Sequence, residues 1–74
     1  MRIREYDQRC ADGNQYEVYS DGSYDAEYRV TSITDGRIVT REVFHGETAL
    51  MDAERRFTED VIRVIHGGQW VRGW

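Results

Sequence analysis

The chain has 74 residues, of which 39% are hydrophobic and 32% charged, and its 14 acidic residues against 10 arginines give a net charge of −4. This composition excludes an intrinsically disordered chain and argues against sequence-independent DNA binding, which requires a basic surface. The length allows one domain over residues 1–74 with a small hydrophobic core.

Cys10 is the only cysteine. An internal disulfide is therefore excluded, and a reducing compartment is favoured. There is no apolar run long enough to cross a bilayer and no signal-peptide pattern. We expect a cytoplasmic protein without membrane association. It would act as a monomer or as a homodimer, since a chain this small gains stability by dimerising.

Asp-Gly occurs at residues 12–13, 21–22 and 35–36, each time between segments rich in Tyr, Val, Ile and Thr. Because Asp-Gly suits hairpin turns that need positive φ, the pattern predicts an antiparallel meander. The predicted strands cover residues 2–8, 15–20, 24–33 and 37–44. The first alternates weakly between apolar and polar residues, so we expect three to four strands.

The turn lengths predict how the strands pair. A loop of residues 21–23 pairs Val18 with Ala26. A loop of residues 35–36 places Tyr28 opposite Val43 and Arg29 opposite Glu42. The helix-facing residues of the sheet are then Tyr16, Val18, Ala26, Tyr28, Val30, Val39 and Val43.

Residues 48–65 are predicted to form an amphipathic helix that ends at Gly67-Gly68. Its apolar stripe consists of Leu50, Ala53, Phe57, Val61 and Val64. A helix of this kind covers one face of the sheet. The predicted fold class is α+β, an antiparallel meander of three to four strands with one amphipathic helix packed on one face.

The opposite face of the sheet combines carboxylates with a tyrosine. Its predicted residues are Glu17, Tyr19, Asp25, Glu27, Arg29, Thr31 and Glu42, with Ile33, Ile38 and Phe44 further along. Such a face is either an ordinary solvated surface or a protein-binding patch. We expect replacement of Tyr19 or Glu27 to leave the stability nearly unchanged.

Residues that could perform chemistry are few. His45, His66 and Cys10 lack the spacing of a zinc site, and no nucleophile motif is present. We expect neither an enzyme nor a metal or cofactor. In the C-terminal segment, Trp70 and Trp74 either complete the core or form an interface.

The segments MRIREY, VYSDGS and EYRV, followed by Gly36, Val39 and Phe44, resemble a small phage anti-CRISPR protein of the type I-F group. The resemblance covers residues 1–44, fades over the predicted helix and is absent from the C-terminal segment. It implies a sheet with helices on one face. It also implies an inhibitor that binds the Cas subunits lining the guide RNA of a type I CRISPR surveillance complex and blocks target DNA binding.

The resemblance further implies that Tyr6 and Tyr19 contact the Cas subunit, while the family's acidic contact is replaced here by Thr31. Combined with the residues predicted on the sheet face opposite the helix, the resemblance predicts a protein-binding site without direct nucleic-acid contact. The protein would act in the cytoplasm of a bacterial host. The predicted site residues are Tyr6, Glu17, Tyr19, Asp25, Glu27, Arg29 and Thr31.

Two other functions stay open. One is a small nucleic-acid-binding regulator that uses Arg29, Arg41 and aromatic side chains on the sheet. The other is an antitoxin-like module acting as a dimer. The negative net charge favours the inhibitor over the nucleic-acid-binding regulator.

Overall fold

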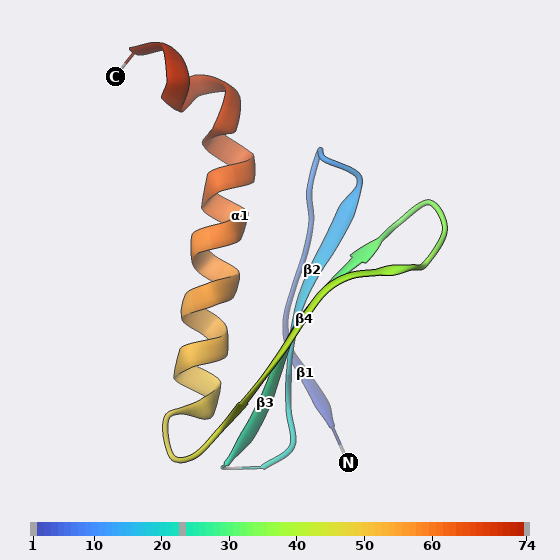
Figure 1. Ribbon diagram of the computed structural model, residues 1–74, viewed down its shortest axis with the longest axis vertical. Helices are drawn as coiled ribbons and strands as arrows, with labels where there is room; N and C mark the ends of the chain where they lie inside the picture. Colours follow the sequence, from blue (N-terminus) through green and yellow to red (C-terminus); the bar gives the residue numbers. More distant parts are fainter. Residues whose placement is uncertain (1, 23, 74) are drawn as a thin grey trace.

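The computed structural model describes the backbone of residues 2–22 and 24–73, and the side chains of residues 2–22 and 24–66. The strands are β1 (Ile3–Arg9), β2 (Asn14–Ser20), β3 (Asp25–Ser32) and β4 (Ile38–His45), followed by the helix α1 (Ala49–Gly73). The strands form one antiparallel sheet in the order β1-β2-β3-β4. Figure 1 shows α1 along one face of this sheet. The predicted α+β meander with a single packed helix is confirmed.

All three Asp-Gly pairs lie in connections between strands. Gly13, Gly22 and Gly36 have φ values of 86°, 92° and 74°, in the left-handed region that glycine tolerates best. Asp12 and Asp35 each accept a hydrogen bond from the main-chain N–H two residues later. These local bonds stabilise the turns, as expected for Asp before Gly.

The core lies between the helix and the two central strands. Its buried apolar residues are Tyr16, Val18, Ala26, Tyr28, Val30, Ala49, Ala53 and Val61. Ala49 and Ala53 are fully buried, and their small side chains allow the helix backbone to approach the sheet closely. Leu50, Phe57 and Val64 are partly buried against this core. The predicted apolar stripe of the helix is therefore confirmed.

The β2–β3 pairing differs from the prediction without changing the faces. Val18 lies opposite Tyr28, whereas a loop of residues 21–23 had placed it opposite Ala26. The connection is longer than predicted, and Ser20 pairs with Ala26. Since the register moves by two residues and side chains alternate with period two, the same residues still face the helix.

The predicted β3–β4 register is wrong by one residue, which reverses the faces of β4 from Thr40 to Phe44. Tyr28 lies opposite Glu42, and Arg29 lies opposite Arg41. The register shifts at a bulge. Val30 pairs with Thr40, but the next residue, Thr31, pairs with Ile38, so Val39 is an extra residue of β4 that has no partner on β3.

This shift corrects the assignments made for β4. Glu42 and Phe44 lie on the helix side, whereas Val43 lies on the outer side. Phe44 packs against the core, and Glu42 accepts a hydrogen bond from Arg56 of α1 at 2.7 Å. The observed register therefore packs Phe44, rather than the smaller Val43, against the core, and it pairs Glu42 with the guanidinium of Arg56.

The helix is longer than predicted, since it continues through Gly67-Gly68 to Gly73. A glycine disfavours helical backbone by about 1 kcal/mol relative to alanine but does not forbid it. The side chains of Trp70 and Trp74 lie outside the described residues. No helix in the described part of the chain is long and apolar enough to cross a membrane.

Candidate protein-binding surface

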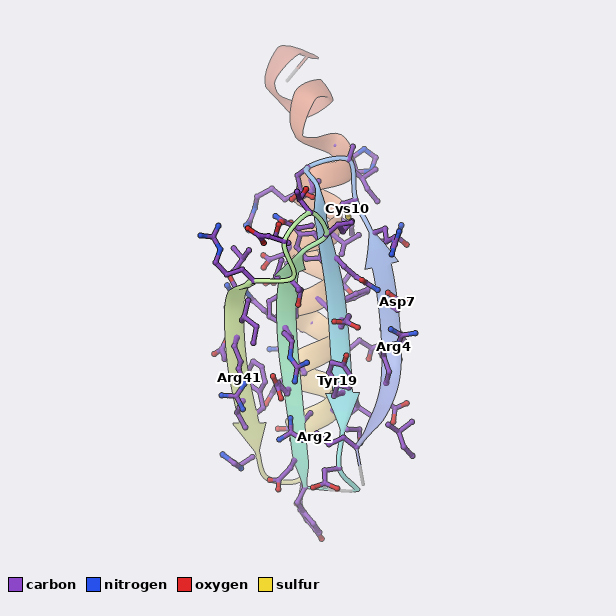
Figure 2. All side chains as sticks on the ribbon, turned by 90° about the vertical axis from the view of Figure 1, so that its right-hand side faces the viewer. Arg2, Arg4, Asp7, Cys10, Tyr19 and Arg41 are labelled. Carbon is purple, nitrogen blue, oxygen red and sulfur yellow. The ribbon has the colours of Figure 1, made fainter. Side chains whose placement is uncertain are left out.

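The face of the sheet opposite α1 is not covered by any other element among the described residues. Figure 2 views this face directly, with α1 behind the sheet. We call it the outer face. Its residues are Arg2, Arg4, Asp7, Arg9, Gln15, Glu17, Tyr19, Asp25, Glu27, Arg29, Thr31, Ile38, Arg41, Val43 and His45.

Six of the seven predicted site residues share the outer face. Strand alternation places Glu17 and Tyr19 of β2 on it, together with Asp25, Glu27, Arg29 and Thr31 of β3. The even register shift between β2 and β3 preserves this grouping. Sequence alternation alone was sufficient to identify it.

Tyr6 is the exception, because it lies on the helix side of the sheet. A bulge between Arg4 and Tyr6 in β1 pairs Tyr6 with Val18, and its ring centroid is 5.7 Å from that of Phe57. A hydrogen bond with Glu54, followed by burial, raises the pKa of Tyr6. Tyr6 and Tyr19 are therefore on opposite faces and cannot contact one flat surface together.

Glu27 occupies the centre of the outer face and is fully buried. Its Oε2 accepts hydrogen bonds from Nε of Arg29 at 2.9 Å and from Nε of Arg41 at 2.8 Å. Its Oε1 accepts one from Arg2. Three guanidinium groups thus converge on one carboxylate: Arg2 comes just before β1, Arg29 from β3 and Arg41 from β4. We call these four residues the Glu27 cluster.

Glu17 forms a second buried group beside this cluster. Its Oε2 accepts hydrogen bonds from Nη1 of Arg4 at 3.1 Å and from the hydroxyl of Tyr19 at 2.8 Å. The guanidinium of Arg29 lies 4.6 Å from the centroid of the Tyr19 ring. Burial, together with the hydrogen bond to Glu17, raises the pKa of Tyr19. Tyr19 and Arg29 therefore link the two buried carboxylates.

The outer face does not offer its central carboxylates to a partner. Glu17 and Glu27 are buried beneath arginines of the same chain, whereas the side chains of Arg4 and Arg41 are 49% and 52% exposed. The groups that a partner would meet first are guanidinium groups and the aromatic ring of Tyr19. Figure 2 shows Arg2, Arg4, Tyr19 and Arg41 on the viewer's side of the sheet.

The expectation that Glu27 could be replaced without loss of stability does not fit this arrangement. A buried carboxylate that satisfies three cations leaves them uncompensated when it is removed. Asp25, by contrast, lies at the end of β3 with a 46% exposed side chain and contacts His45 at 2.8 Å. It is the site residue that behaves as a surface acid.

Sequence reasoning did not include Arg2, Arg4 and Arg41 in the site. The predicted β3–β4 register placed Arg41 on the helix side, so the error in register removed it from the outer face. Arg2 and Arg4 occupy alternate positions of the first predicted strand. That spacing was the signal that both could share one face.

Among the described residues, no group of three or more His, Cys, Asp or Glu side chains is arranged to hold a metal ion. Burial raises the pKa of the Cys10 thiol, which disfavours the reactive thiolate. No protein-family model matches the chain, and no curated protein or solved structure matches it.

Proposed function

We propose that this chain is an inhibitory binding module that acts by covering part of the surface of a larger protein assembly. The observation that supports this proposal is the uncovered outer face, on which Tyr19 and four arginines are held in fixed positions. Tyrosine and arginine are the residue types that most often dominate the energy of protein interfaces.

The hydrogen bonds within the outer face favour this role. Tyr19 is held by Glu17 and by stacking with Arg29, and Arg29 is held by Glu27. Side chains that are ordered before binding lose less conformational entropy when a partner docks. A preorganised surface of this type supports stoichiometric binding.

The resemblance of residues 1–44 to a type I-F anti-CRISPR protein supplies the partner in this proposal, a Cas subunit of a type I CRISPR surveillance complex in a bacterial host. Binding would block access of target DNA to the complex. The contact would be made by Tyr19 and its neighbours on the outer face. Tyr6 would instead support the fold through Phe57.

The experiment measures binding of target DNA to a purified type I surveillance complex as this protein is added. We expect inhibition that saturates near the number of binding sites per complex. Tyr19→Ala should weaken inhibition at least about tenfold, the effect of losing about 1.4 kcal/mol of interface energy. Tyr24→Ala is the matched control, because Tyr24 is exposed outside the outer face.

Circular dichroism and thermal melting of both variants establish that the fold is retained. Equal inhibition by the wild type and Tyr19→Ala would contradict the assigned surface. Absence of any binding to type I complexes would contradict the assigned partner. Inhibition by far fewer molecules than there are complexes would indicate an enzymatic mechanism.

The arginines of the Glu27 cluster favour a second candidate, a nucleic-acid-binding regulator. Guanidinium groups bind phosphates well, and Tyr19 provides a ring on which a base could stack. The net charge of −4 opposes this function. Affinity for single-stranded DNA or RNA that falls steeply as salt rises would favour it over the inhibitor.

A further inference from the structure

Arg29 and Arg41 lie directly opposite each other in the antiparallel pair formed by β3 and β4. Like charges in such positions destabilise a sheet unless an anion lies between them. Glu27 is that anion, since the same Oε2 accepts a hydrogen bond from Nε of both arginines. This arrangement fixes two guanidinium groups side by side on the outer face.

The Glu27 cluster has more positive than negative charge. The guanidinium groups of Arg2, Arg29 and Arg41 carry three positive charges against the single negative charge of Glu27, a surplus of two. Each guanidinium has five N–H donors, whereas a carboxylate has about four acceptor positions. The cluster therefore has many more donors than Glu27 can satisfy.

The orientation of the arginines makes this surplus accessible. Arg29 and Arg41 use Nε to hold Glu27, and their side chains are 30% and 52% exposed. A guanidinium anchored through Nε keeps a planar edge of terminal amino groups that matches the two oxygens of a carboxylate. Preorganisation by Glu27 reduces the entropy lost when such an edge is engaged.

We propose that Arg2, Arg29 and Arg41 form a receptor for a carboxylate of the partner, an Asp or Glu side chain on an acidic protein surface. This inference rests on the proposed function and specifies the chemistry of the partner. It requires that the partner present negative charge to the outer face.

Charge on the rest of the protein favours a protein carboxylate over a nucleic acid. The whole chain has a net charge of −4, and Asp7 of β1 and Asp25 at the start of β3 lie on the outer face beside the Glu27 cluster. A long polyanion would be repelled by this surrounding charge. A single carboxylate can bind to the local surplus of positive charge at the Glu27 cluster without approaching the rest of the protein. Tyr19, stacked on Arg29, supplies the adjacent apolar contact.

The first experiment follows the arginine Nε–Hε resonances by NMR while a short oligoglutamate peptide is added. We expect saturable shifts for Arg29 and Arg41, and an affinity about tenfold lower in Arg41→Gln, as for loss of a charge-assisted hydrogen bond. Arg55→Gln is the control. Arg55 is also exposed, but it lies on α1 and pairs loosely with Asp52 at 3.9 Å. Its replacement should leave the peptide affinity unchanged.

A thymidine oligonucleotide of the same net charge is titrated in parallel. Tighter binding of the oligonucleotide than of the peptide would overturn the proposal in favour of phosphate recognition. Absence of saturable shifts with the peptide, or equal losses in Arg41→Gln and Arg55→Gln, would also overturn it.

The second experiment repeats the surveillance-complex assay with Arg41→Gln and Arg55→Gln. A loss of inhibition confined to Arg41→Gln supports the receptor. Inhibition that is equal in both variants and the wild type contradicts the receptor while leaving the proposed function intact. If the wild type does not bind the complex, the proposed partner fails, and the peptide titration still decides whether the carboxylate receptor exists.

Discussion

The hydroxyl of Tyr28 on β3 donates a hydrogen bond to Oδ2 of Asp60 on α1, over 2.6 Å. Tyr28 is fully buried, and Asp60 also contacts Arg56 and Arg63 at 3.2 Å each. Burial, together with the hydrogen bond to Asp60, raises the pKa of Tyr28. This bond fixes the position of the helix on the sheet and satisfies the one polar atom of the largest buried side chain.

Replacing Tyr28 with Phe should destabilise the fold by about 1 kcal/mol, the usual net contribution of one hydrogen bond. The ring remains, so core packing is kept, and Asp60 retains its two arginine partners. Urea denaturation measures the change. Tyr24→Phe, at an exposed position, is the control and should have no effect. A Tyr28→Phe protein as stable as the wild type would contradict the structural role of this bond.

Stability should fall at alkaline pH because Tyr16 and Tyr28 both have raised pKa values. Burial is the main cause for both, followed by hydrogen bonds to Asp12 and Asp60 respectively. In the unfolded chain these phenols ionise near a pKa of about 10. Their contribution to stability is thus fully present below that pH. It is lost as the pH rises further, since the unfolded state releases the protons first.

The alkaline transition can be followed by tyrosinate absorbance and circular dichroism in the same titration. We expect part of the tyrosine absorbance change to coincide with unfolding. Tyr28→Phe should reduce the slope of stability against pH above about 10. Ionisation of all tyrosines with the fold intact would contradict the burial of Tyr16 and Tyr28.

Ala53→Leu should destabilise the protein by about 1–3 kcal/mol, the usual effect of overpacking a core. Ala53 is fully buried where α1 faces the sheet, so a larger side chain would push the helix away. Met51→Leu, at an exposed helix position, is the control. Calorimetric melting of both variants measures the difference. An Ala53→Leu protein with an unchanged melting temperature would mean that the helix is not seated closely on the sheet.

Glu27→Gln should destabilise the fold by about 1.5–3 kcal/mol, the range for hydrogen bonds to charged groups. The amide keeps the shape of the side chain but leaves Arg2, Arg29 and Arg41 without their shared anion. Asp25→Asn is the control on the same strand and face, and it should change the stability by less than about 0.5 kcal/mol. Chemical denaturation of both variants tests this contrast, and equal effects would contradict the Glu27 cluster.

Local sequence signals were sufficient for the elements and for most of the core. Each Asp-Gly pair marks a connection between strands, because its glycine adopts positive φ and two of the three aspartates bond to the main chain of the turn. Spacings of three and four predicted which side of α1 meets the sheet. The faces of β2 and β3 were also predictable, since a register shift of two residues leaves alternation unchanged.

Only the tertiary structure decided which residues of β1 and β4 join each face. A single extra residue in each of these strands reverses every side chain on one side of the bulge. Strand alternation does not reveal such a residue, because its position depends on the packing of both faces. At β4, packing favours Phe44 on the core, Glu42 beside Arg56 and Arg41 on Glu27. The sequence therefore determined that an open face with Tyr19 and Glu27 exists, while long-range pairing made that face a layer of arginines over buried carboxylates.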